Sequence, residues 1–179
     1  MSQIKVDSIV PRGGVPAGAD GGGIIQVVQT VKSDTFSANN TSTFTDITGL
    51  SATLTPKSTS NKILIRYNVA SSMTTGGYVC HIRLLRGSTD IAQGDADGFK
   101  IQATTSAYSG STNADYPVYY QVCEFLDSPA TTSATTYKLQ SRGWNTSAGT
   151  YYINNSASES NTVNYARIIS TITLYEISG

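Results

Sequence analysis

Apolar and polar residues alternate in short blocks along most of this sequence. Residues 62–70 read KILIRYNVA, and in an extended chain Ile63, Ile65, Tyr67 and Val69 share one side, because side chains of a strand alternate between two faces. This pattern predicts a strand with one apolar face turned to a core. Similar blocks predict further strands at 24–36, 44–47, 50–55, 78–86, 91–94, 118–126, 136–141, 151–154 and 165–177. No block has the period of a helix.

The block at 165–177 (YARIISTITLYEI) is apolar on both of its sides. One side carries Ile168, Ile172 and Leu174, and we expect this side to face the core. A strand with one face in water would be polar on the other side, so the second side needs a cover as well. We expect that cover to be a neighbouring subunit, with the candidate interface residues Ile169, Thr171, Thr173, Tyr175 and Ile177.

The spacing of the strands predicts an all-β fold. They follow one another at intervals of roughly ten to twenty residues without helices, which is typical of an antiparallel sandwich or jelly roll. In a jelly roll the first and last strands lie side by side, so 165–177 is expected to pair with 24–36. The length suits one domain at 24–179, with 95–116 as its least regular part.

The first 23 residues have a different character. Residues 2–10 (SQIKVDSIV) alternate like a short strand, and residues 11–23 are rich in Pro and Gly and predict a linker. One interpretation is a loose terminus. The interpretation that we prefer is an anchor that adds a strand to another protein, with Ile4, Val6, Ile9 and Val10 as its candidate contacts.

Composition narrows the possible partners. The formal net charge is zero and charged residues make up 13% of the chain. Without a basic surface the chain is not expected to bind nucleic acid. No apolar run approaches the roughly 20 residues of a membrane helix, and the N-terminus lacks the long apolar core of a signal peptide. We therefore expect neither membrane insertion nor secretion by the usual route.

The residues that could carry chemistry are few and poorly placed. His81 is the single histidine, and it lies inside a predicted strand, where it points away from Cys80. Cys80 and Cys123 are expected to be buried thiols, with a disulfide as the alternative. Neither cysteine forms a metal-binding spacing with His81. We expect no catalytic residues, no metal and no cofactor.

One loop has the composition of a binding site. Trp144 lies in the polar segment RGWNTSAGT beside Arg142 and Asn145, and an indole next to hydrogen-bond donors is suited to stacking on a sugar ring. With Tyr151 and Tyr108 these residues form the candidate ligand-binding set. The alternative role for the same side chains is packing within the loops or contact between subunits.

Six segments of the chain resemble a known family. These are SQIKVDSIVPRGG, GGGIIQVVQTVKSDTFS, TDITGLSATLTPKSTSNKILI, RLLRGSTDIAQGD, FLDSPATTSATTYKLQ and STITLYEI. They resemble small virion appendage proteins of tailed phages, especially those of marine and cyanobacterial hosts, described as tail-fibre-like or head-fibre proteins. The likeness covers most of the chain except 95–116 and the loop around Trp144, and binding loops commonly vary on a constant scaffold.

The resemblance implies a trimeric jelly roll similar to tumour necrosis factor-like heads, located on the virion. It implies that residues 1–23 attach the head to a capsid or tail protein. Our hypothesis adds that loops far from this attachment touch a host-surface glycan. An alternative is a capsid decoration or cement protein that stabilises the shell. A carbohydrate-active enzyme is the least favoured alternative, because no set of catalytic residues supports it.

Overall fold

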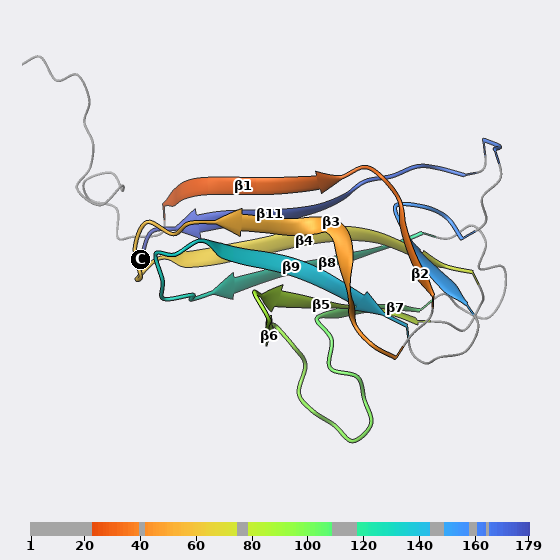
Figure 1. Cartoon of the computed structure of the whole chain (residues 1–179), viewed down its shortest axis with the longest axis horizontal. Coiled ribbons are helices and arrows are strands. Elements are labelled where there is room, and N and C mark those ends of the chain that lie inside the picture. The colour runs from red at the N-terminus through yellow and green to blue at the C-terminus, as the bar shows by residue number, and fades with distance from the viewer. Residues whose placement is uncertain are drawn as a thin grey trace, which may run out of the picture.

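The structure is a computed structural model and describes residues 23–39, 42–74, 79–108, 118–143, 149–157, 161–163 and 165–179. Within these residues every regular element is a strand, and the strands form two antiparallel sheets (Figure 1). The strands are β1 (Ile24–Lys32), β2 (Phe36–Asn39), β3 (Thr45–Leu54), β4 (Lys62–Met73), β5 (Val79–Arg86), β6 (Thr89–Ile91), β7 (Thr105–Tyr108), β8 (Tyr119–Asp127), β9 (Thr135–Arg142), β10 (Thr150–Ile153) and β11 (Ser170–Ile177).

The strand order of the two sheets defines a jelly roll. In sheet A, β4 pairs with β8 along one edge, and with β11 and β10 along successive parts of its other edge. β1 pairs with β11, and β2 pairs with β10. In sheet B the order is β3-β9-β5, and β5 then pairs with both β6 and β7. The expected pairing of the first and last strands is confirmed, because β1 and β11 are neighbours.

The core lies between the inward faces of the two sheets. The four residues expected on the core side of β4 are all buried, with at most 1% of each exposed. On β11, Ile172 and Leu174 are fully buried, as expected. Closely packed branched and aromatic side chains of this kind supply most of the free energy of folding. The largest members of the core are Tyr67, Tyr137, Tyr151, Leu50, Leu54, Ile63, Ile65, Met73, Ile82, Leu84, Leu139 and Ile153.

The last strand is shorter than the sequence predicts. The prediction that it begins at residue 165 was wrong. β11 begins at Ser170, which pairs with Lys32, the last residue of β1. The pairing of β11 with β1 ends at this residue, and farther along β4 the strand paired with it is β10. Residues 165–169 therefore lie outside the ladder, and Ile168 is half-buried instead of lying in the core.

Two other strand boundaries differ from the sequence pattern. The predicted strand 24–36 is interrupted after Lys32, where the Asn154 side-chain amide donates to the carbonyls of Lys32 and Asp34 at 2.8 and 3.0 Å and turns the chain toward β2. In contrast, the predicted strands 44–47 and 50–55 join into β3 through a register shift. Gly49 makes this possible with a φ of 85°, a conformation that other residues rarely adopt.

Both cysteines are free thiols, so the disulfide alternative is not realised. Cys80 is buried on the inward side of β5, and burial raises the pKa of its thiol to about 12. Cys123 on β8 is only half-buried, against the prediction, although burial also raises its pKa. A thiol with a raised pKa carries little thiolate at neutral pH and is a poor nucleophile.

Candidate functional site

Sheet A presents an outward surface that we call the outer A face. It consists of the side chains of β1, β11, β4 and β8 that point away from sheet B. Its strand pairing places these side chains in rows across the sheet. One row is apolar throughout and runs Val27–Tyr175–Leu64–Leu126. Val27 and Leu126, at its two ends, are 54% and 47% exposed.

The next row of the outer A face is polar, and its members bind one another. Gln29 donates from Nε2 to Thr173 Oγ1 at 2.8 Å, and Arg66 forms an ion pair with Glu124 at 3.3 Å. A third row runs Val31–Thr171–Asn68–Val122, and its terminal valines are 51% and 62% exposed. Between these two rows lies a shallow depression of about 280 Å³.

Exposed apolar side chains gather on this sheet. Val27 and Val31 on β1 have counterparts on the opposite edge strand β8, and Ile169 is 52% exposed immediately before β11. A sheet face with apolar groups in water is a common mark of a protein interface. The exposed large apolar residues of sheet A and its margin are Ile24, Val27, Val31, Tyr120, Val122, Leu126 and Ile169.

Most of the candidate interface residues lie where the alternation predicted. Thr171, Tyr175 and Ile177 point outward on β11 and are half-buried within the single chain. Thr173 also belongs to the outer A face, but only 4% of it is exposed, because the Gln29 side chain binds its hydroxyl and Tyr175 and Arg66 are its neighbours. A partner subunit could therefore contact Thr171 and Tyr175 directly, but could scarcely reach Thr173.

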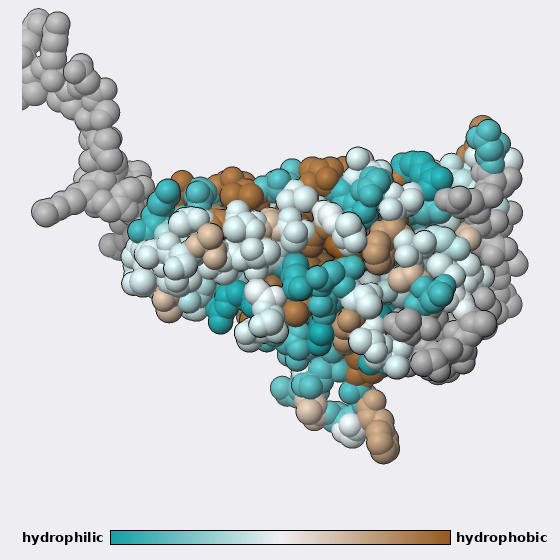
Figure 2. All heavy atoms as spheres, in the orientation of Figure 1, coloured by the Kyte–Doolittle hydropathy of each residue, from teal (hydrophilic) through white to brown (hydrophobic). Residues whose placement is uncertain are grey.

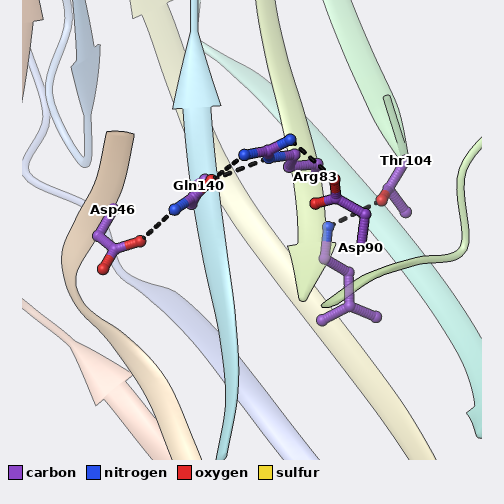
Figure 3. A network of polar contacts seen from close by, with 6 residues as sticks. Asp46, Arg83, Asp90, Thr104 and Gln140 are labelled. Carbon is purple, nitrogen blue, oxygen red and sulfur yellow. Dashed lines mark hydrogen bonds and ion pairs between the residues drawn. The ribbon is translucent and has the colours of Figure 1, made fainter. Parts of the chain in front are cut away.

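The outward surface of sheet B, the outer B face, has the opposite character. A chain of polar contacts crosses it: Gln140 donates to Asp46 at 2.6 Å, Arg83 donates to Gln140 at 2.6 and 2.8 Å, and Arg83 also binds Asp90 at 2.9 Å (Figure 3). Lys138 forms an ion pair with Asp46 at 2.9 Å. Figure 2 shows hydrophilic atoms over the middle of this face and apolar atoms along the margin formed by β1.

The structure separates the candidate ligand-binding residues. Trp144 and Asn145 lie outside the described residues. Tyr151 belongs to the core with 1% of it exposed, and its hydroxyl lies 3.1 Å from Ser141 Oγ, so its prediction as a ligand contact was wrong. Its ring points into the core between the two sheets, where its hydroxyl meets Ser141 of β9. Arg142 and Tyr108 remain accessible on the outer B face.

The remaining sequence predictions concern the N-terminal anchor, metal binding and membrane helices. The anchor candidates Ile4, Val6, Ile9 and Val10 lie outside them. No three His, Cys, Asp or Glu side chains of the described part are placed to hold a metal ion. The described part also contains no helix that is long and apolar enough to cross a membrane.

His81 is half-buried on the outer B face, where it pairs with Arg142 of β9 on one side and Ser106 of β7 on the other. Burial lowers the pKa of the imidazole, and the positive charge of Arg142 lowers it further, to about 4. His81 is therefore neutral at pH 7. Its position on a strand, opposite in direction to Cys80, agrees with the alternation.

We expect the stability of the protein to fall as the pH drops from about 6.5 to about 4, partly because of His81. In the unfolded chain the imidazole has its ordinary pKa of 6.5, whereas in the folded chain the pKa is about 4. The unfolded state therefore binds a proton that the folded state excludes, and acid favours unfolding. Urea unfolding at pH 7 and pH 4.5 measures this loss. His81→Gln should lose less stability than the wild type over this interval, and an equal loss would contradict the assignment.

Topology and surface together define an antiparallel jelly-roll domain in which one outer face carries apolar rows beside a polar row and the other outer face is polar. No family model matches the sequence, and no curated protein matches it. The fold is similar to solved structures of infectious bursal disease virus. That of the Gx strain is 13% identical, with 98% of this chain and 45% of that chain covered and a TM-score of 0.43. The VP2 subviral particle is 13% identical, with 86% and 40% covered and a TM-score of 0.44.

This chain thus spans less than half the length of the viral proteins that it matches. The strand order of its two sheets defines the fold without reference to these structures.

Sequence reasoning missed several residues of the two outer faces. Phe44, which precedes β3, lies close to two arginines: the Arg83 guanidinium carbon is 4.3 Å and that of Arg142 5.6 Å from the ring centre. The sequence holds no signal for this arrangement, because the three residues come from segments that are far apart along the chain. The sequence could have indicated part of the apolar row of the outer A face. By the alternation of their strands, Val27 and Leu126 point to the side that faces away from the core.

Proposed function

We propose that this chain is a non-enzymatic structural subunit of a virus particle, of the tail-fibre-like or head-fibre kind, that assembles as a homotrimer through its outer A face. The observation that carries the proposal is the outward side of β11. It lies between β1 and β4 and continues into apolar side chains on β1 and β8. The resemblance of the sequence to phage appendage proteins and the jelly-roll topology support the same proposal.

The apolar rows explain why a partner would bind this face. Covering Val27, Val31, Val122 and Leu126 removes apolar surface from water, which contributes about 25 cal/mol for each Å². In the polar row between them Gln29 binds Thr173 and Arg66 is paired with Glu124, so covering this row leaves no unpaired charge, although the ion pair opposes burial. The outer B face carries more charged groups, among them Asp46, Lys138, Arg83 and Asp90, and would be more costly to bury.

The attachment to the particle is assigned to residues 1–23. Gly23 lies beside the C-terminal end, where its carbonyl accepts a hydrogen bond from the Ser178 amide at 2.9 Å. Both described ends of the domain are thus at one end of the sandwich, at the left in Figure 1. An anchor that enters there would leave both outer faces accessible.

The molar mass in solution tests the proposal. Multi-angle light scattering of residues 1–179 and of residues 24–179 should give three times the mass of one chain in both cases. The shorter chain should no longer join particles that lack the native subunit. A monomeric mass for both chains would overturn the trimer, and binding of the full chain to empty capsids alone would favour a decoration protein over a fibre.

A further inference from the structure

A long loop, residues 92–104, connects β6 to β7 and projects away from the sandwich at the bottom of Figure 1. Phe99 lies in this loop, and its side chain is fully exposed. A phenyl ring held entirely in water adds nothing to the core of its own domain. Aromatic side chains are enriched where proteins bind one another. Phe99 is therefore available as a contact for a partner.

Hydrogen bonds give this loop a defined shape. At its tip the Lys100 amide donates to the Asp97 carbonyl at 3.0 Å, and the side chains of the two residues form an ion pair. Between them Gly98 has a φ of 55°, a conformation that favours glycine. Nearer the base, Gln102 Nε2 donates to the Gly94 carbonyl at 2.9 Å. A loop that is already ordered loses little entropy when its tip binds a partner.

The loop begins at the edge of the sandwich where the outer A face ends. β6 and β7 both pair with β5, and β7 lies close to β8, whose described partner in sheet A is β4. The Tyr67 hydroxyl lies 2.8 Å from Thr105 Oγ1 and joins β4 to β7 here. In a ring of three copies the outer A face of one copy meets a different surface of the next, because such contacts are heterologous. The β8 edge with its projecting loop is a surface of this kind.

The loop is long enough to reach across a neighbour's outer A face. Each of its two legs has about six residues, and a chain of that length spans at most about 20 Å. The four strands of the outer A face are about 5 Å apart, which makes the face about 15 Å wide. The tip of the loop can therefore reach any strand of that face on an adjacent copy.

The depression of about 280 Å³ on the outer A face has room for a phenyl ring. Val122 of β8 and Tyr175 of β11 are the apolar side chains in its lining, and Thr171 and Asn68 are among its polar ones. Val122 is 62% exposed in the single chain. A phenyl ring placed beside Val122 would remove apolar surface of both partners from water, which favours association.

The charges around the depression match those of the loop. Arg66 lines the depression and forms an exposed ion pair with Glu124 at 3.3 Å. In the loop the exposed pair of Asp97 and Lys100 flanks Phe99. Laid against each other, the two pairs can place the Asp97 carboxylate beside Arg66. The Lys100 ammonium group then meets Glu124. Charge complementarity of this kind fixes the orientation of two partners.

We propose that Phe99 of each subunit inserts into the depression on the outer A face of a neighbouring copy, beside Val122. The charged pair of the loop, Asp97 and Lys100, binds the charged pair of that face. This inference rests on the proposed function, because it takes the partner of the outer A face to be a second copy of this chain. Each copy gives one loop and receives one, so three copies close a ring.

Phe99→Ser tests the inserted ring. We expect it to weaken the association of the subunits by about thirtyfold, the effect of losing one interface hot spot. The stability of the single domain should not change, because the ring is exposed there. Val163→Ser is the matched control, since Val163 is also a fully exposed apolar residue but lies outside the loop. Light scattering over a dilution series measures association, and thermal unfolding measures stability.

Exchanging the charges of either pair tests the orientation. Asp97→Lys together with Lys100→Asp reverses the loop pair, and Arg66→Glu together with Glu124→Arg reverses the pair on the face. Each reversal keeps the ion pair within its own chain but brings like charges together between chains. We expect each reversal alone to weaken association by about tenfold and both together to restore it. Unchanged association after either reversal, or no recovery in the combined protein, would contradict the charge contacts.

A disulfide between chains tests the location directly. Lys100→Cys and Glu124→Cys in one chain, with Cys123→Ser to remove the neighbouring thiol, should form cross-linked dimers and trimers on oxidation. Cys80 is fully buried and does not interfere. The control pairs Lys100→Cys with Thr53→Cys, an exposed position of sheet B, and should give no such products. Electrophoresis without reducing agent separates the cross-linked species.

The inserted loop and the trimer can fail separately. A trimer that keeps its mass after Phe99→Ser and forms no disulfide between residues 100 and 124 would overturn the inserted loop and leave the trimer intact. A wild-type mass of two chains that falls to one chain in Phe99→Ser would overturn the trimer and support the loop contact. A wild-type protein that stays monomeric would overturn both.

Discussion

Thr171→Lys is expected to convert the assembled protein into folded monomers. Thr171 lies at the middle of the outer A face, between Val31 and Asn68, and is half-buried within one chain. In a free chain a lysine at this position can extend its ammonium group into water. In the proposed trimer the same group would be covered without a partner, at about 3–5 kcal/mol for each copy.

Two further variants make this result specific. Thr53→Lys places the same charge at an exposed strand position of sheet B and should leave the molar mass unchanged. Thr173→Lys should lower the stability of the single domain itself, because Thr173 is buried and bound by Gln29. Light scattering and thermal unfolding measured together distinguish the three cases. A Thr171→Lys protein with the mass of the wild type would show that the outer A face is not the interface.

Glu176→Ala is expected to produce the second large effect, a loss of about 3 kcal/mol or more in the free energy of unfolding. The Glu176 side chain is fully buried at the end of β11. It accepts hydrogen bonds from the Lys57 amide at 2.5 Å, Asn61 Nδ2 at 2.6 Å and Gln26 Nε2 at 3.2 Å. Alanine would leave these donors without their acceptor, and each hydrogen bond to a charged group contributes about 1.5–3 kcal/mol.

Glu176→Gln is the matched control. Its carbonyl oxygen can keep the bonds from Lys57 and Asn61, and its amide can donate to Gln26 if that side chain turns over. The loss should therefore be clearly smaller than for alanine. Urea unfolding followed by circular dichroism measures both variants, at one fixed protein concentration because assembly adds to apparent stability. Equal losses for the two variants would contradict the role assigned to the carboxylate.

The candidate site could be predicted only in part. The expectation of a cover on both faces of β11 came from its own residues, and so did the outward direction of Thr171 and Tyr175, which the strand pairing confirms. The sequence does not show that Val27 and Leu126 form a row with Tyr175. Such rows depend on the register of four strands that are far apart in the sequence. Tyr151 shows the opposite error, because proximity to a polar loop suggested an exposed ring, whereas the ring points into the core between the two sheets.

The sequence by itself determined the all-β class, the approximate strands, the core side of β4 and the pairing of the first strand with the last. Each of these depends on local alternation or on a general rule of jelly rolls. Only the tertiary structure decided that Glu176 is a buried acceptor, that β11 begins at Ser170, and that Arg142, His81 and Phe44 meet on one face. These features arise from contacts between segments that are distant in the sequence. Such contacts produce no periodic pattern of residues from which they could be predicted.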